Sequence, residues 1–353
     1  MKIILHVLIN IVSLKLMKNL TFESLRSLIN VPKRVAIIPH INPDGDAIGS
    51  SLGLYNYLVQ KKHNVKVISP NDYADFLKWI PGTEQIINYD SHSIEANEFL
   101  KKIDIIFTLD FNSLSRCGDI KHIIESTNAI KIMIDHHEQP EDYADFTYSD
   151  TNMGSTCEMV YHFIDKLGDA QMINKDIGIA LYTGILTDTA SFRFPKTSAT
   201  THRVVAKLIE KGVNHSKIHN NIYDNNSFGR LKLIGIALKN LKLINSNASL
   251  ITLSQSELDD CAYKKGDTEG LVNYGLSIKG VILTAIFIEN EKEGIIKISL
   301  RSKGQIDVNE IAKKYFNGGG HKNASGGKSF DNLENTVKQF KSITSSISAF
   351  SNE

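Results

Sequence analysis

The sequence predicts an α/β fold with a parallel sheet in an N-terminal domain and a smaller α/β domain after it. Runs rich in Ile and Val alternate with helical patterns, as they do where helices connect buried parallel strands. The chain has 353 residues, more than one domain usually contains. Its composition, 42% hydrophobic and 22% charged, is typical of a globular protein with an ordinary core.

Four apolar runs are the predicted strands of the first domain. They are RVAIIPH (34–40), VKVIS (65–69), IDIIFTLD (103–110) and IKIMIDHH (130–137). The spacers between them are long enough for the crossover connections that parallel strands require. Beyond about residue 150 the pattern changes, and 154–168, 174–189 and 200–212 carry helical spacing. We expect helices there.

Strand-like runs return in the second half of the chain, at 248–254, 281–289 and 294–302, before a helical stretch at 307–316 and a glycine cluster. The polar stretch DNNSFGR is the most suitable linker. The predicted organisation is therefore a first domain over 17–223, a linker over 224–230 and a second domain over 231–353.

The first sixteen residues, MKIILHVLINIVSLKL, resemble a signal peptide only superficially. They lack a small-x-small cleavage site, and they are shorter than the ~20 residues that span a bilayer. We expect residues 1–16 to be an over-extended start, followed by an amphipathic helix that opens near Met17. The three cysteines are odd in number and widely spaced, which favours reduced thiols in a cytoplasmic protein without a membrane segment.

The formal net charge of +1 excludes one class of function. A protein that binds long nucleic acid through many phosphate contacts carries a strongly basic field, and this chain as a whole has none. A local basic pocket for a short substrate is compatible with this charge.

Acidic and imidazole side chains gather where the apolar runs end. They are His40, Asp44, Asp46, Asp110, Asp135, His136, His137 and Asp188. In open α/β sheets, ligands bind outside the carboxyl ends of the strands, so these groups are expected to converge on one site. Any one of the aspartates also fits a helix cap or a turn, Asp44 in NPDGD most of all.

The donor set indicates the kind of site. Carboxylates and imidazoles without a thiolate suit Mn²⁺, Mg²⁺ or Fe²⁺ better than a structural zinc. Crowded carboxylates repel one another unless cations neutralise them, so their number favours more than one ion. Two ions that share a bridging carboxylate are the usual apparatus for cleaving phosphate esters.

Five segments together resemble a known family. HINPDGDAIGS (40–50), TLDFNSLSR (108–116), IDHH (134–137), ILTDT (185–189) and RSKGQIDVNEIAKKYFNGGGHKNASGG (301–327) resemble, in the family's order, the motifs of DHH phosphoesterases with a C-terminal DHHA1 domain. Within that family they are most similar to the bifunctional oligoribonucleases and pAp phosphatases, or nanoRNases. The resemblance covers about residues 20–340 and implies an active site in a cleft between the two domains.

The resemblance also implies roles for the acidic and imidazole groups. One metal would be held by His40, Asp44 and Asp110, and the second by Asp46, Asp110, His136 and Asp188. Asp110 would bridge two divalent ions, for which Mn²⁺ is expected. The resemblance makes Asp135 a carboxylate that orients an imidazole, and it directs His137 toward the substrate phosphate.

The C-terminal motif would hold the substrate. Gly318, Gly319 and Gly320 let backbone N–H groups approach an anion, and His321 and Arg301 would add contacts to a phosphate. A turn between a helix and a strand also explains the glycines by themselves. Arg116 and Arg193 are further candidates for substrate binding, although a surface salt bridge would account for either.

The expected function is two-metal hydrolysis of short oligoribonucleotides from an end, together with removal of the 3′-phosphate of pAp. Water would attack phosphorus in line, without a Ser or Cys nucleophile. The alternative is a phosphodiesterase of cyclic dinucleotides or of pApA. A non-catalytic nucleotide sensor would have lost ligands that are present here, and GGGHKNASGG disfavours a pyrophosphatase. The resemblance also allows a homodimer.

Overall fold

The computed structural model describes residues 20–347, and the chain divides after Asp224 into two compact units. The first unit contains the predicted Ile- and Val-rich strands that end in polar residues. The second contains the later strands and the glycine cluster. Residues 1–16, predicted to be an over-extended start, lie outside the described range.

The first unit is a parallel α/β structure. Its strands are β1 (Arg34–Pro39), β2 (Asn64–Ser69), β3 (Ile86–Asn88), β4 (Ile105–Leu109), β5 (Ile130–Asp135) and β6 (Phe146–Ser149). Its helices are α2 (Phe22–Ile29), α3 (Gly45–Gln60), α4 (Tyr89–Leu100), α5 (Lys121–Ser126), α6 (Thr156–Lys166), α7 (Lys175–Asp188), α8 (Ala199–Glu210) and α9 (His215–Tyr223). The strands pair in the order β3-β2-β1-β4-β5-β6, every pair parallel.

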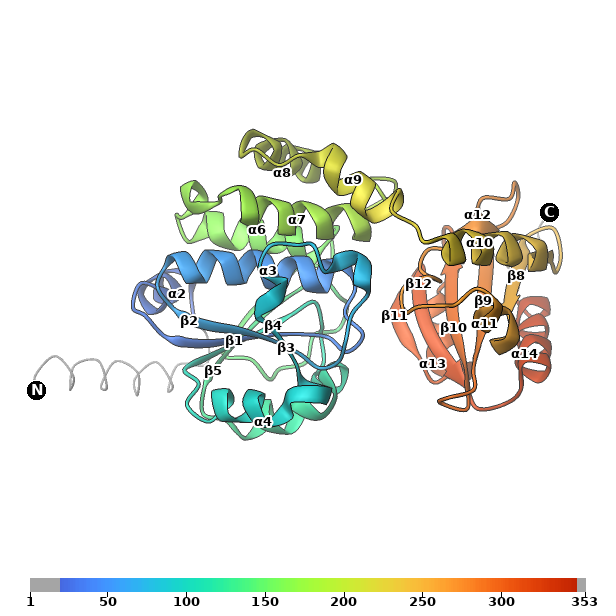
Figure 1. Cartoon of the computed structure of the whole chain (residues 1–353), viewed down its shortest axis with the longest axis horizontal. Coiled ribbons are helices and arrows are strands. Elements are labelled where there is room, and N and C mark those ends of the chain that lie inside the picture. The colour runs from blue at the N-terminus through green and yellow to red at the C-terminus, as the bar shows by residue number, and fades with distance from the viewer. Residues whose placement is uncertain (1–19, 348–353) are drawn as a thin grey trace, which may run out of the picture. The chain divides into compact units, whose positions relative to one another are not determined.

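The parallel sheet is buried on both faces. Along β1, Val35 and Ile37 enter a core shared with α3 and α6, whereas Ala36 and Ile38 enter a core shared with α4 and α5. Figure 1 shows α3, α6 and α7 stacked on one side of this sheet and α4 on the other. Strands covered on both faces must be apolar at successive positions, which explains the continuous Ile and Val runs.

Glycines allow α3 and α7 to approach closely. Gly45, Gly49 and Gly53 lie one turn apart along α3, and each faces α7. A Cβ on Gly49 would lie 2.6 Å from the carbonyl oxygen of Ala180. Gly49 therefore packs directly against the backbone of α7. This packing brings the first turn of α3 beside the last turn of α7.

The second unit is a smaller α/β structure with a mostly antiparallel sheet. Its strands are β7 (Lys242–Leu243), β8 (Ala248–Leu253), β9 (Leu283–Asn290), β10 (Ile295–Ser302), β11 (Gly319–His321) and β12 (Ala324–Ser329). Its helices are α10 (Phe228–Asn240), α11 (Gln255–Asp260), α12 (Asn273–Leu276), α13 (Val308–Tyr315) and α14 (Leu333–Ser345). The strand order is β11-β12-β10-β9-β8-β7. Among the described strands of this second sheet, β8 and β9 form the only parallel pair. Helices α13 and α14 pack on one face, and α10 and α11 on the other.

The predicted fold class is confirmed, with additions at the sheet edges. The sequence did not indicate β3, β6, β7, β11 or β12, each of which lies at or next to an edge. The glycine cluster, which is also typical of a turn, contributes strand β11, and the predicted linker at 224–230 shares its last three residues with α10. Within residues 20–347, no helix is both long enough and apolar enough to cross a bilayer.

Candidate metal centre

Three neighbouring strands of the parallel sheet end in residues of the candidate site. His40 follows β1, Asp110 follows β4 and His136 follows β5. These strands are adjacent in the sheet, so their carboxyl ends bring the three side chains together. Asp46 joins them from the first turn of α3, and Asp188 from the last residue of α7. Asp46 and Asp188 thus reach the site from helices, whereas His40, Asp110 and His136 directly follow strands.

His40, Asp44 and Asp110 form a first group of ligand atoms close enough to hold one ion. His40 Nε2 lies 3.4 Å from Asp110 Oδ2 and 3.9 Å from Asp44 Oδ1. Asp44 is also the N-cap of α3, because its Oδ1 accepts hydrogen bonds from the N–H groups of Asp46 and Ala47. The side chain of Asp44 therefore caps α3 and also belongs to the first group of ligand atoms.

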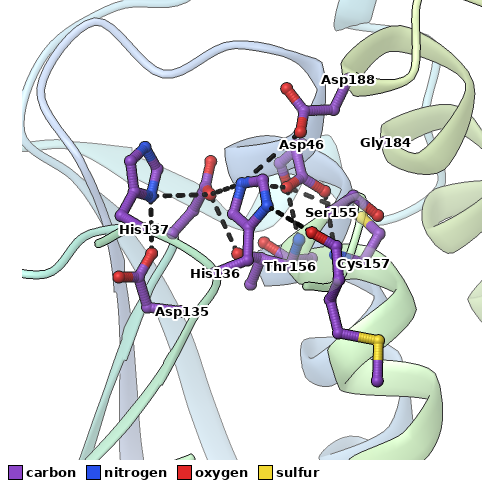
Figure 2. Close-up of polar contacts among 12 residues, drawn as sticks. Asp46, Asp135, His136, His137, Ser155, Thr156, Cys157, Gly184 and Asp188 are labelled. Carbon is purple, nitrogen blue, oxygen red and sulfur yellow. Dashed lines mark hydrogen bonds and ion pairs between the residues drawn. The ribbon is translucent and has the colours of Figure 1, made fainter. Parts of the chain in front are cut away.

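Asp46, His136 and Asp188 form a second such group. His136 Nε2 lies 3.9 Å from Asp46 Oδ2 and 3.5 Å from Asp188 Oδ2. Figure 2 shows the three side chains directed toward one another. They are three of the four residues that the family resemblance assigns to the second metal, the fourth being Asp110.

Asp110 lies between the two groups. Its Oδ2 faces His40 Nε2, and its Oδ1 is 3.5 Å from His136 Nε2. The residue is buried and has a φ of 65°, a left-handed conformation that aspartate adopts more readily than most residues. One carboxylate thus presents one oxygen to each group, which is the arrangement of a bridging ligand.

Both imidazoles present Nε2 to the carboxylates and use Nδ1 elsewhere. His40 Nδ1 lies 2.8 Å from the carbonyl oxygen of Ile41, and His136 Nδ1 lies 3.2 Å from that of Met153. A carbonyl oxygen accepts only an N–H, so these contacts place the ring proton on Nδ1 and leave the lone pair of a neutral ring on Nε2. Metal-binding histidines are generally held in this way.

Burial and like charge make the group of acids costly without a cation. Burial raises the pKa of Asp46, and the negative charges of Asp110 and Asp188 raise it further. Burial also raises the pKa of Asp188 to about 7. Burial alone would raise the pKa of Asp110, but hydrogen bonds with His136 and His40 hold it well below its usual range.

The imidazole of His136 responds in the opposite sense. Burial by itself would lower its pKa, but the hydrogen bond with Asp110 and the charges of Asp188, Asp110 and Asp46 outweigh burial and raise it to about 10. Without a bound cation, His136 is therefore protonated, and its positive charge lies next to the three carboxylates. Divalent ions would supply that charge, so the donor set fits them.

The N-terminus of α6 donates hydrogen bonds to two carboxylates of the site, and the sequence patterns did not predict these contacts. The N–H groups of Thr156 and Cys157 donate to Asp46 Oδ2 and Oδ1, at 2.6 and 2.9 Å. Thr156 Oγ1 donates to Asp110 Oδ1 at 2.9 Å. Ser155, the N-cap, and Glu158 three residues later mark the start of a helix in the sequence. No residue near Ser155 in the sequence indicates which carboxylates would accept hydrogen bonds from this helix start.

Asp135 and His137 form a buried pair next to Asp110, whose Oδ1 lies 3.8 Å from His137 Nδ1. His137 Nδ1 lies 2.7 Å from Asp135 Oδ1 (Figure 2). Burial, reinforced by the charge of Asp110, raises the pKa of Asp135 to about 7. Burial lowers the pKa of His137 well below its usual value, so the ring is neutral at physiological pH. The contact is of the kind expected of a carboxylate that orients an imidazole, and the assigned role stays a prediction.

Arg116 and Arg193, the two further candidates for substrate binding, lie in different surroundings. Arg116 is half-buried, and its carbonyl oxygen accepts the N–H of Ile41, which follows His40. Its charge lowers the pKa of both His40 and His137. Arg193 is exposed and donates from Nε to the carbonyl oxygen of Ala190. Of the two, only Arg116 has a charge that acts on the site imidazoles.

The glycine cluster of the second unit forms part of a hairpin that packs against α13. The N–H groups of Gly318 and Gly320 donate to the carbonyl oxygen of Ala312 and to Asn309 Oδ1, both on that helix. Gly320 has a φ of 147°, and a Cβ there would lie 2.7 Å from the carbonyl oxygen of Ala324. The assignment of Gly318, Gly319 and Gly320 to substrate binding stays a prediction.

Arg301 and His321 occupy one row across the second sheet. Arg301 on β10 pairs with Ala324 on β12, and Ala324 pairs with His321 on β11. Directly paired residues point to the same face, so the two side chains share a face with one strand between them, ~10 Å apart along the hydrogen-bonding direction. Their predicted phosphate contact is compatible with this placement and remains a prediction.

Comparison with known proteins identifies the family. Residues 34–185 match the DHH family, N-terminal domain, and residues 249–346 match the DHHA1 domain. The chain is 27% identical over 316 residues to the probable bifunctional oligoribonuclease and PAP phosphatase NrnA of Streptococcus mutans, covering 89% of this chain and 95% of that protein. It is 31% identical to the bifunctional oligoribonuclease and PAP phosphatase NrnA of Thermus thermophilus, covering 86% and 88% of the two chains.

A solved structure gives the same result. An exopolyphosphatase-related protein from Bacteroides fragilis superposes with a TM-score of 0.87 and 39% identity, covering 91% of this chain and 94% of that one. The resemblance drawn from the five sequence segments is confirmed. The chain belongs to the DHH family of phosphoesterases, carries a C-terminal DHHA1 domain, and is an enzyme that acts on phosphoester bonds.

Proposed function

We propose that this phosphoesterase hydrolyses short oligoribonucleotides from an end to mononucleotides and removes the 3′-phosphate of pAp. The observation that carries the proposal is the pair of ligand groups joined by Asp110, which belongs to the first group and lies 3.5 Å from His136 of the second. Two ions joined by a carboxylate suit the cleavage of phosphate esters, because they stabilise both the attacking and the leaving oxygen. The relatives named as oligoribonucleases and PAP phosphatases support the choice of substrate.

In this proposal His40, Asp44 and Asp110 hold one divalent ion, and Asp46, Asp110, His136 and Asp188 hold the other. Mn²⁺ is the expected metal. The bound ions would supply Lewis-acid activation of water and would neutralise charge on the phosphoryl oxygens. The protein fixes the ligands beforehand, since Asp46 is held by two N–H groups and both imidazoles are held through Nδ1.

The remaining residues would act on the substrate. His137 is neutral, and its bond to Asp135 fixes the orientation of the ring. It would contact a phosphate oxygen or assist the leaving oxygen, a task suited to a positioned imidazole. Arg301, His321 and Arg116 would bind phosphates that are not cleaved. A guanidinium can contact a phosphate through two N–H groups, which suits Arg301 to this role.

A substrate panel tests the proposal. Purified protein with Mn²⁺ is supplied with pAp, dinucleotides, longer oligoribonucleotides, cyclic di-AMP and pyrophosphate, and the initial rates are compared. We expect pAp and oligomers of a few nucleotides to be turned over fastest. Hydrolysis of cyclic di-AMP faster than of pAp and the oligoribonucleotides would replace the proposal with the dinucleotide phosphodiesterase alternative. Metal binding without turnover of any nucleotide would favour a sensor.

A further inference from the structure

Thr156, the first residue of α6, contacts two acids of the candidate metal centre at once. Its Oγ1 donates to Asp110 Oδ1 at 2.9 Å, and its N–H donates to Asp46 Oδ2 at 2.6 Å. The residue is completely buried. Figure 2 shows Thr156 beside Asp46 and His136. One residue therefore touches two carboxylates that are 64 positions apart in the chain.

The hydroxyl of Thr156 has a different kind of acceptor from the hydroxyls of Thr183 and Thr189. Thr183 lies in α7, and Thr189 directly follows that helix. Each donates to the carbonyl oxygen four residues earlier in the chain. Thr156 instead donates to a side chain 46 residues away. At the start of a helix no carbonyl oxygen four residues earlier in that helix exists, so the hydroxyl is available for another acceptor.

The hydroxyl of Thr156 donates to the Asp110 oxygen that lies nearer to His136. Asp110 Oδ1 is the oxygen that faces His136, whereas Oδ2 faces His40. A carboxylate oxygen has two lone-pair directions, so a donor on one leaves the other for a cation. Thr156 thus contacts Asp46 and the oxygen of Asp110 that is nearer to His136, and neither contact falls on His40 or Asp44.

We propose that Thr156 is a positioning residue of the metal centre, whose hydroxyl orients the bridging carboxylate toward the ion held by Asp46, His136 and Asp188. The inference rests on the proposed two-metal function. The branched side chain limits χ1, so the hydroxyl is held in place with little additional ordering. Hydrogen-bond partners of metal ligands typically contribute ~10-fold to 100-fold in metal affinity.

The test compares Mn²⁺ binding by the full-length chain after treatment with a chelator. Thr156→Val removes the hydroxyl and keeps the shape, and Thr156→Ser restores it. Thr183→Val is the matched control, because it removes an equally buried hydroxyl that donates only within its own helix. Titration calorimetry should show one of two binding steps weakened ~10-fold to 100-fold in Thr156→Val. Thr156→Ser and Thr183→Val should bind as the wild type does.

Thermal unfolding with and without Mn²⁺ provides a second measurement. A purely structural role would lower the metal-free midpoint of Thr156→Val and leave both binding steps unchanged, and that result would overturn the inference. If Thr156→Val does not fold, Thr156→Ala serves the same test, because the contact to Asp46 comes from the backbone. Failure of the wild-type chain to bind Mn²⁺, Mg²⁺ or Fe²⁺ would contradict the proposed function instead.

Discussion

At the scale of single residues, the candidate site is made of groups that could not be buried separately. Asp46, Asp110 and His136 are each at most 2% exposed. An isolated buried charge costs several kcal/mol, so each must be paired or must bind a cation. Their mutual contacts satisfy part of that requirement. What remains is an excess of carboxylates, which is the condition in which protein sites bind divalent ions.

Asp110 is the residue on which both ligand groups depend. Asp110→Asn keeps the shape of the side chain and tolerates the left-handed backbone, so it removes mainly the charge. We expect loss of both ions and a fall in turnover of more than ~100-fold, since even partners of ligands contribute up to that amount. Metal content after dialysis and the rate with pAp measure the two effects.

Asp44→Asn is the matched control for this change. It makes the same chemical substitution in a ligand of one group only, and asparagine preserves the helix cap. We expect weaker binding of one ion and retention of the other. Near-normal metal content and turnover in Asp110→Asn would contradict the assignment of a shared ligand.

At the scale of elements, the site depends on how closely helices pack. Gly184 on α7 faces α6 and α3, and a Cβ there would overlap Cys157 Sγ and lie 2.9 Å from Asp46 Oδ1. Figure 2 shows Gly184 beside Cys157 and Asp46. The absence of a side chain on α7 thus makes room for a ligand on α3. The close packing of α7 on α3 and α6 therefore also determines where Asp46 lies.

Gly184→Ala tests this dependence. Overpacking of a filled core typically costs ~1 to 3 kcal/mol, and here the displaced atoms belong to a predicted metal ligand. We expect a lower thermal midpoint and weaker Mn²⁺ binding. Gly235→Ala on α10 is the control, because a Cβ there meets no atom within 4 Å and alanine should stabilise the exposed helix by ~0.5 to 1 kcal/mol. Unchanged Mn²⁺ affinity in Gly184→Ala would show that α7 can move without disturbing Asp46.

A polar cluster joins the end of α3 to the loop between α6 and α7. Asp169 accepts hydrogen bonds from Lys61 Nζ at 2.7 Å and from the Tyr57 hydroxyl at 2.5 Å. Burial by itself would raise the pKa of Asp169, but these two bonds outweigh burial and lower it. The ionised carboxylate therefore stabilises the folded state.

The pH dependence of this contribution follows from its sign. Because the pKa of folded Asp169 lies below the unfolded value of about 3.9, the stabilisation is complete above that pH. It declines as the pH falls through the folded pKa. Asp169→Asn should cost ~1 to 3 kcal/mol near pH 7, as expected for bonds to a charged acceptor, and progressively less below about pH 4. Urea unfolding of the two proteins from pH 3 to 8 checks this, and a difference that stays constant over the range would contradict it.

At the scale of the whole molecule, the sequence predicts the parts that a local pattern encodes. Long apolar runs that end in His40, Asp110 and Asp135 are recognisable, because buried parallel strands must be apolar throughout and ligands lie at their ends. The short strands β3 and β6 carry no such pattern, because three or four half-buried residues are too few to establish a period. The fold class was therefore predictable, and the edges of the sheets were not.

Contacts between distant segments escaped prediction for a different reason. The link from Thr156 to Asp110 depends on where α6 begins relative to β4, which no neighbouring residue encodes. The left-handed backbone of Asp110 has no local indication either, because aspartate occurs in every loop conformation. Sequence patterns thus indicated the ligands themselves, whereas the groups that hold them emerged only from the packed structure.

The two units permit a prediction that separates chemistry from substrate binding. The two ligand groups joined by Asp110 come from the first unit, and the proposed phosphate contacts Arg301 and His321 come from the second. Substituting either of the latter with alanine should leave metal content unchanged. Loss of a charge-assisted phosphate contact typically costs ~1.5 to 3 kcal/mol, or roughly tenfold to a hundredfold in kcat/KM if the transition state keeps the contact.

The choice of substrate makes this last prediction specific. Arg301→Ala and His321→Ala should impair hydrolysis of pAp and dinucleotides strongly, and that of bis(p-nitrophenyl) phosphate little, because the latter offers no second phosphate to bind. Lys297→Ala is the control, since Lys297 lies on the same strand as Arg301, points to the same face and pairs with Glu293 at the surface. It should affect neither substrate. Equal losses on both substrates would contradict the proposed phosphate contact and leave the glycine hairpin the structural role of packing within its domain, where Gly318 and Gly320 donate to Ala312 and Asn309.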